Sequence, residues 1–245
     1  MARNIKLTLE YDGTDYVGWQ VQPGLPTVHG VLVEGLKKIT GEEVALIASG
    51  RTDAGVHALG QVANFKTTSS ISVDGIRDGL NSVLPKDVAI TEALEVPPGF
   101  DSRRDARSKT YAYRVLRREH RSPVLGRFSW HVDLPLDTDV MSEGAALLVG
   151  RKDFSSFRAA DSDAAHSVRE IFSFDVGKEG DMIELRVRGT GFLRHMVRAM
   201  VAALVELGSG RITLADLARI VEARSRAAAP WTAPARGLFL MEVEY

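Results

Sequence analysis

The chain opens with a segment, IKLTLEYDG, in which apolar residues occupy every second position: Ile5, Leu7, Leu9 and Tyr11. This alternation predicts a β-strand with one buried face, and the Asp-Gly pair that ends the segment predicts a turn. From Thr27 to Thr40 the apolar residues recur at helical spacing, and Thr27 is placed to cap that helix at its N-terminus.

The same succession of strands and helices is predicted twice along the chain. In the first half it is completed by the strands EVALIAS and QVANFK, a helix around Ile76 and Leu80, and the strand DVAITEALEV. In the second half it consists of TYAYRVLR, a helix starting near Asp137, the hairpin VREIFSFDV–MIELRVRG, a helix over 192–207, and the closing strand GLFLMEVEY. A short helix capped by Thr213 precedes that last strand.

Two successive β-α-β-β-α-β units predict an α+β protein of two ferredoxin-like (βαββαβ) domains. We place these domains at 1–107 and 108–245, because prolines, a glycine and charges interrupt the periodicity in VPPGFDSRRDARSK. A sheet of this kind carries helices on one face, so its other face must be covered or used. We therefore expect the two sheets to join around a central cleft.

Composition narrows the class of protein. The 245 residues contain no cysteine, which excludes disulfides, zinc–thiolate sites, iron–sulfur clusters and cysteine nucleophiles. No segment approaches the roughly 20 apolar residues of a membrane span, and the N-terminus enters a strand without a signal-peptide core. We expect a cytoplasmic protein that does not associate with membranes.

Positive charge is concentrated in two segments, although the formal net charge of the chain is −1. Residues 101–121 hold eight Lys/Arg against three acids, and residues 186–198 hold four arginines and no acid. Such stripes on a nearly neutral protein favour one particular polyanion over a general affinity for nucleic acid. The alternative is a solvated charged face without a partner.

The loop within ASGRTDAGVHALGQVANF is unusually polar. Gly50 and Gly55 have the spacing of a phosphate loop, but Val-His stands where Lys-Ser/Thr is required, which excludes a nucleoside-triphosphate site. Asp53 and His57 are four residues apart, as metal ligands can be, but no further ligand cluster is near, so we expect no metal. Asp53 is then either a turn residue or a lone catalytic carboxylate that an arginine keeps ionised.

The segment GRTDAGVHA resembles the signature loop of the TruA family of tRNA pseudouridine synthases. Further segments resemble that family in order along the chain: YDGTDYVGWQ, TYAYRV, GTGFLRHMVR and APARGLFLMEVEY. The resemblance covers essentially the whole chain. It implies two ferredoxin-like domains, a homodimer, and an enzyme that needs no cofactor and no metal.

The resemblance also implies the reaction, which converts uridine to pseudouridine at positions 38, 39 and 40 in the anticodon stem-loop of tRNA. The N1–C1′ glycosidic bond breaks, the uracil rotates, and a C5–C1′ bond forms. Because substrate and product are isomers, the reaction requires no redox partner, nucleotide cofactor or energy source.

Roles for individual residues follow from the same resemblance. Asp53 matches the catalytic aspartate, which attacks the nucleotide at C1′ or at uracil C6. Arg51 resembles the arginine that helps displace the target base, a step that costs a few kcal/mol. Tyr111 resembles the active-site tyrosine that stacks on the flipped uracil, and its hydroxyl is a candidate general base. The alternative for Tyr111 and Tyr113 is burial within an alternating strand.

Arg198, in HMVR, resembles the arginine that pairs with the aspartate and keeps it charged. Arg194, four residues earlier and on the same face of the predicted helix, is the alternative partner. Leu238, in RGLFL, resembles the apolar residue that packs against the target uracil or its pairing partner; otherwise it is a core leucine. Four arginines are candidate phosphate contacts: Arg103, Arg104, Arg107 and Arg114.

Two other classes of function compete with the enzyme. A non-catalytic tRNA-binding module or chaperone would use the basic segments but not Asp53, since ferredoxin-like sheets also bind RNA. A glycosidase that cleaves small nucleosides would need two cooperating carboxylates, and the sequence offers Asp53 no evident acidic partner.

Overall fold

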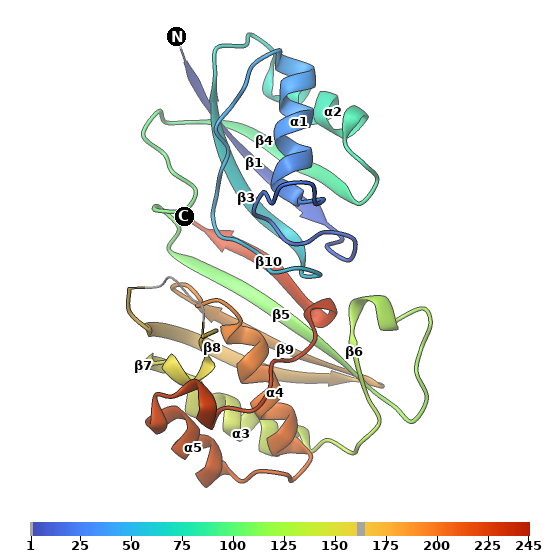
Figure 1. The fold of residues 1–245 in the computed structure, drawn as a ribbon, viewed down its shortest axis with the longest axis vertical. Coiled ribbons are helices and arrows are strands. Elements are labelled where there is room, and N and C mark those ends of the chain that lie inside the picture. The colour runs from blue at the N-terminus through green and yellow to red at the C-terminus, as the bar shows by residue number, and fades with distance from the viewer. Residues whose placement is uncertain (1, 161–164) are drawn as a thin grey trace. The chain divides into compact units, whose positions relative to one another are not determined.

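The computed structural model describes residues 2–160 and 165–245 of the chain. The chain divides into two compact units, unit 1 (Met1–Arg107 and Phe239–Tyr245) and unit 2 (Ser108–Leu238). Each unit consists of a β-sheet with α-helices packed against it (Figure 1). The architecture is therefore mixed α/β, as the alternation of strand and helix patterns predicts.

Unit 1 contains the predicted succession of elements: β1 (Arg3–Tyr11), α1 (Val28–Thr40), β2 (Ile47–Ala48), β3 (His57–Thr67), α2 (Val73–Val83) and β4 (Val88–Val96). In its sheet, β1 lies between β4 and β3 and pairs antiparallel with both, while β2 pairs antiparallel with β3. Ile5, Leu7 and Leu9 are fully buried, as their alternation predicts. The predicted N-cap is confirmed, because the Thr27 side chain accepts a hydrogen bond from Gly30 N.

Unit 2 contains β5 (Ser108–Arg117), β6 (Trp130–Val132), α3 (Thr138–Leu148), β7 (Gly150–Asp153), β8 (Val168–Glu179), β9 (Met182–Gly189), α4 (Met196–Gly208) and α5 (Leu214–Ala223). The strand β9 pairs antiparallel with both β5 and β8, and β8 pairs with β7. Asp137 caps α3, and Thr213 forms a capping box with Asp216 at the start of α5. The short strands β6 and β7 were not predicted, because three or four residues carry too little periodicity.

The helix α4 begins later than the sequence pattern predicts. His195 precedes its first residue, Met196, and adopts a left-handed backbone with φ 64°. Arg194 therefore lies outside the helix, and the prediction that Arg194 and Arg198 share one helical face is wrong. The apolar spacing around Phe192 and Leu193 was misleading because Leu193 is buried without being helical.

The last strand, β10 (Leu238–Glu244), belongs to unit 1 from Phe239 onward, whereas the sequence pattern placed it with residues 108–245. Phe239 and Leu240 pair in parallel with His57 and Ala58 of β3. Gly60 permits this close approach, because a Cβ atom there would lie 2.3 Å from the Met241 carbonyl oxygen. A long-range strand pairing of this kind leaves no local signal in the sequence.

Among the residues that the structure describes, none of the helices combines the length and hydrophobicity that crossing a bilayer requires.

Candidate active site

Asp53 lies in the loop of residues 49–56, between β2 and β3 of unit 1. Its side chain is half-buried, the preceding Thr52 is buried, and Arg51 is exposed. Val56 N donates to Asp53 O (3.2 Å) across a tight turn, in which Gly55 adopts φ 74°. The loop thus presents the Asp53 carboxylate from a sharply turned backbone.

The backbone around Asp53 is hydrogen-bonded to the segment 12–19, which follows β1. Trp19 N donates to the Thr52 carbonyl (3.0 Å), and Gly55 N donates to the Tyr16 carbonyl (3.2 Å). Gly18 makes the approach possible, since a Cβ atom there would lie 2.8 Å from the Thr52 carbonyl oxygen, and its φ of 104° disfavours other residues. These contacts fix the backbone at Thr52 and at Gly55, on either side of Asp53 and Ala54.

Two buried side chains fix the same loop from within the sheet. The hydroxyls of Tyr11 and Thr52 form a hydrogen bond of 2.7 Å, and burial raises the pKa of Tyr11 to about 12. Gln61 accepts a bond from Ser49 Oγ (2.7 Å) and donates to the Gly50 carbonyl (3.0 Å). Side-chain and backbone bonds therefore constrain residues 49–55 from two sides.

His57 has a structural environment. Its ring is buried, stacks on Phe239 at 4.7 Å, and receives a hydrogen bond from Gly13 N to Nδ1 (3.0 Å). Asp12 Oδ1 also lies 3.1 Å from that Nδ1 atom. In the part of the chain that the structure describes, no group of three or more His, Cys, Asp or Glu side chains could hold a metal ion.

The two tyrosines of β5 in unit 2 have different environments. Tyr113 is fully buried, its hydroxyl donates to the Pro234 carbonyl (2.7 Å), and burial raises its pKa well above the usual range. Tyr111 is 8% exposed and lies edge-on to Phe192, with ring centroids 5.2 Å apart. Since Tyr113 is fully buried and Tyr111 keeps some exposure, Tyr111 is the better candidate for contact with a substrate base.

Arg198 and Leu238 also belong to unit 2. Arg198 projects from α4, and its Nε donates to the Ala233 carbonyl (2.7 Å), while Ala233 N donates to the Arg198 carbonyl (3.2 Å). Leu238 is buried at the start of β10. Arg51 and Asp53 thus lie in unit 1, whereas Tyr111, Arg198 and Leu238 lie in unit 2. The pairing of Asp53 with Arg198 stays a prediction.

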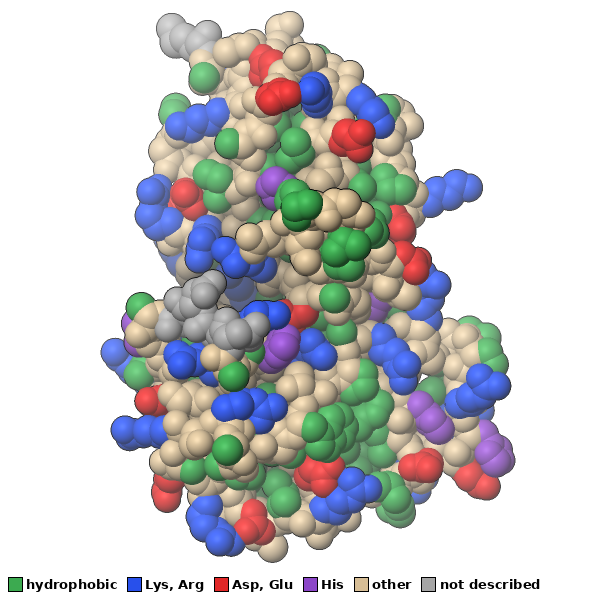
Figure 2. All heavy atoms as spheres, viewed as in Figure 1, with side chains coloured by type: hydrophobic (Ala, Val, Ile, Leu, Met, Phe, Trp, Pro, Cys, Tyr) green, Lys and Arg blue, Asp and Glu red, His purple; other side chains and the backbone are tan. Residues whose placement is uncertain are grey.

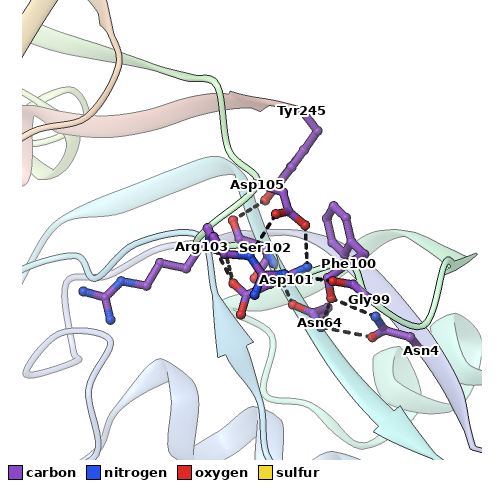
Figure 3. Close-up of polar contacts among 10 residues, drawn as sticks. Asn4, Asn64, Gly99, Phe100, Asp101, Ser102, Arg103, Asp105 and Tyr245 are labelled. Carbon is purple, nitrogen blue, oxygen red and sulfur yellow. Dashed lines mark hydrogen bonds and ion pairs between the residues drawn. The ribbon is translucent and has the colours of Figure 1, made fainter.

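Polar contacts hold the loop that carries Arg103 and Arg104 (Figure 3). Asn64, which is buried on β3, accepts a hydrogen bond from Ser102 N (2.8 Å) and donates to Asn4 Oδ1 (3.0 Å). Tyr245 donates to the Ser102 carbonyl (2.8 Å). Asp101 Oδ1 accepts from the backbone N atoms of both arginines, each at 2.9 Å. These bonds constrain the backbone of the loop from several sides.

The four arginines predicted to contact phosphate differ in their surroundings. Arg104 bonds through its guanidinium to Asp105 and to the Gly99 carbonyl. The Arg103 side chain extends away from these contacts in Figure 3 and is exposed. Arg107 is exposed as well, whereas Arg114 forms an ion pair with Glu184 (3.6 Å). Arg103 is therefore the best placed of the loop arginines to bind an incoming anion.

Sequence reasoning did not assign a role to Tyr11, Thr52 or Gln61, although all three hold the Asp53 loop. The segment YDGTDYVGWQ could have indicated these contacts, because its two glycines interrupt a series of larger side chains. In the structure these glycines, Gly13 and Gly18, contact the backbone of the Asp53 loop.

The family model described as tRNA pseudouridine synthase matches residues 8–103 and 145–245. The tRNA pseudouridine synthase A of Myxococcus xanthus is 49% identical over 242 residues, which cover 98% of this chain and 91% of that protein. The proteins of the same name from Pelobacter propionicus and Geotalea daltonii are 48% and 46% identical to this chain. Each alignment covers 99% of this chain and 100% of the relative.

Among solved structures, this chain aligns with a chain of the "Cbf5-Nop10-Gar1 Complex" with a TM-score of 0.36 and 15% identity. The alignment covers 82% of this chain and 45% of the chain in that complex. That likeness is too distant to carry an argument. The family match covers most of the chain, and the relatives are nearly half identical over almost its full length. The chain belongs to the tRNA pseudouridine synthase family.

Proposed function

We propose that this chain isomerises uridine to pseudouridine at positions 38, 39 and 40 of the tRNA anticodon stem-loop, with Asp53 as the nucleophile. The observation that carries the proposal is the placement of Asp53. It is the half-buried acid of the matched loop, and the Thr52 carbonyl before it and the Gly55 N–H two residues after it are hydrogen-bonded to segment 12–19. Such preorganisation lowers the cost of bringing a nucleophile to a reacting carbon.

The chemistry balances without an external reactant. If Asp53 attacks C1′, an ester bond forms as the N1–C1′ bond breaks, and the uracil leaves with the electron pair. After rotation, C5 attacks C1′, the ester bond breaks, and the C5 proton passes to a base while N1 gains a proton. Attack at uracil C6 is the alternative route. Either route ends with the carboxylate free.

The other predicted residues have roles around this centre. Arg51 is exposed beside Asp53, which suits a side chain that enters the gap left by the displaced base. We propose that Arg198 faces the Asp53 carboxylate and keeps it ionised. Tyr111 would stack on the uracil and Leu238 would line its pocket. Arg103, Arg104, Arg107 and Arg114 would contact phosphates.

We also propose that the protein is a cytoplasmic homodimer of two ferredoxin-like domains around an RNA-binding cleft. The strand order of unit 1 supports its ferredoxin-like fold, because β4, β1, β3 and β2 are neighbours in that order and all pair antiparallel. Unit 2 supplies the first five elements of such a series, β5, α3, β8, β9 and α4, whereas the strand that would complete it, β10, belongs to unit 1 from Phe239 onward.

Release of tritium from 5-tritiated uridine in unmodified tRNA tests the catalytic assignment. Asp53→Asn and Asp53→Ala are expected to abolish release while tRNA binding persists. Asp78→Asn, which removes an exposed carboxylate of α2, is the matched control and is expected to remain active. Full activity of Asp53→Ala would falsify the assignment.

Tritium release and a second assay on free uridine distinguish the proposed isomerase from the two competing functions. A tRNA-binding module without chemistry would release no tritium in any variant, including the unmodified chain. A nucleoside glycosidase would release uracil from free uridine, which the proposed isomerase leaves intact.

A further inference from the structure

We infer that unit 2 carries a further RNA contact, in which the indole of Trp231 stacks on a nucleotide that flanks the target uridine. This inference rests on the proposed function, in that tRNA is the substrate. It concerns a residue to which the sequence pattern and the family resemblance assign no role.

The Trp231 ring is unusually exposed and yet held in place. Its side chain is 47% exposed, and it packs edge-on against Trp130 with ring centroids 5.0 Å apart. Trp130 in turn packs edge-on against the buried Tyr113. An aromatic ring that is fixed by its edge and open to solvent loses little conformational entropy when a base stacks on it.

The segment that carries Trp231 is fixed by side chains on both sides. Arg226 bonds to the Ala229 and Pro230 carbonyls and to Thr232 Oγ1. Further along, the Ala233 carbonyl accepts from Arg198 and the Pro234 carbonyl accepts from Tyr113. Such contacts are typical of a preorganised binding surface, in which recognition requires no ordering of the loop.

The segment of Trp231 is connected by hydrogen bonds to Arg198, which we propose to act at the reaction centre. Trp231 lies two residues before Ala233, so the two Cα atoms are at most about 7 Å apart. Ala233 exchanges two hydrogen bonds with Arg198, which we propose to face Asp53. Neighbouring bases of a stacked strand are separated by about 3.4 Å, so the indole is within reach of a nucleotide close to the target.

Charge favours RNA over an apolar protein partner at this surface. The two segments around the tryptophans, 117–131 and 224–237, contain seven arginines and one acid, Glu119. The segments are joined by a hydrogen bond from Arg236 Nε to the Ser129 carbonyl (3.2 Å). Figure 2 shows Lys and Arg side chains beside hydrophobic ones on the viewed face of unit 2. Aromatic rings among cations are the usual components of a single-strand RNA surface.

Tryptophan fluorescence and kinetics with an unmodified tRNA transcript test the inference. Because Trp19 is buried and Trp130 is half-buried, stacking on Trp231 is expected to quench most of the exposed emission, and Trp231→Phe is expected to lose most of that quenching. Trp231→Ala is expected to raise the KM for tRNA roughly 5- to 100-fold with little change in kcat, whereas Trp231→Phe stays within about threefold. Phe172→Ala, at an exposed aromatic residue of β8, is the matched control and is expected to leave KM unchanged.

Unchanged tRNA affinity of Trp231→Ala, with an unchanged thermal unfolding transition, would overturn the inference. An altered oligomeric state of Trp231→Ala with normal tRNA affinity would also overturn it, because Trp231 would then belong to a protein interface. Quenching does not require catalysis. If Asp53→Ala remained active while Trp231→Ala bound tRNA weakly, the catalytic proposal would fail and this inference would stand.

Discussion

The hydroxyls of Tyr11 and Thr52 lie 2.7 Å apart in the interior of unit 1. The bond joins the last residue of β1 to the residue that precedes Asp53. Because burial raises the pKa of Tyr11 to about 12, the phenol stays protonated at any ordinary pH and the bond persists. The first strand thus directly determines the backbone position of the proposed nucleophile.

Tyr11→Phe is expected to lower both the free energy of unfolding and kcat. The variant leaves the buried Thr52 hydroxyl without this partner, at a cost of about 1–3 kcal/mol. The free energy is measured by urea unfolding and kcat by tritium release. Tyr245→Phe is the control, since its hydroxyl bonds to Ser102 in the arginine loop and not near Asp53. Equal kcat for Tyr11→Phe and the unmodified chain would contradict the prediction.

Gly18→Ala is expected to reduce kcat more than Gly24→Ala does. Both glycines have positive φ, so each substitution carries a backbone strain of about 1–2 kcal/mol. At Gly18 the new Cβ atom would also lie 2.8 Å from the Thr52 carbonyl, whereas nothing lies within 4 Å of it at Gly24. Tritium release measures kcat of both variants, at a temperature at which both are fully folded. Similar kcat values would show that the contact between Gly18 and the loop is unimportant.

Arg103→Ala is expected to weaken tRNA binding more than Arg104→Ala does. Arg104 already bonds to Asp105 and the Gly99 carbonyl, whereas Arg103 extends outward from an ordered loop. Loss of one phosphate contact reduces the slope of log affinity against log salt by about one. Binding titrations across a range of salt concentrations measure that slope. If Arg103→Ala left it unchanged, Arg103 would not be a phosphate contact.

Glu42→Gln is expected to lower the free energy of unfolding at pH 7, and the difference from the unmodified chain is expected to shrink as the pH falls. Hydrogen bonds from Thr67 and Thr68 lower the pKa of the Glu42 carboxyl in the folded protein. A lowered folded-state pKa stabilises the fold above the unfolded pKa of about 4.3, and this contribution disappears as pH falls through the folded value. Urea unfolding of both chains at pH 7, 4 and 3 provides the test. A difference that stays constant with pH would argue against a role for the ionised carboxylate.

Much of the secondary structure could be predicted from local patterns. Thr27, Asp137 and Thr213 cap the predicted helices, and Ile5, Leu7 and Leu9 form the buried face of β1. These features can be predicted because helix capping and strand alternation depend on residues that are only a few positions apart. The start of α4 was predicted too early, since a left-handed His195 has no reliable signal in a single sequence.

The candidate site was predictable in part. The Asp53 loop and Arg198 stand out through residue type and through resemblance to a family. The contacts that hold the loop do not, because Tyr11 and Thr52 are 41 residues apart and either could be an ordinary buried side chain. Trp231 looks equally ordinary in the sequence, and its exposure is known only from the structure.

By itself, the sequence determined the order of the longer strands and helices, the family, and the acid on which the proposed chemistry depends. Tertiary structure decided that β10 joins the sheet of unit 1, that Gly13 and Gly18 lie against the Asp53 loop, and which arginines already have partners. The physical reason is range: propensity and capping act between neighbours, whereas strand pairing and side-chain contacts join residues that are distant along the chain.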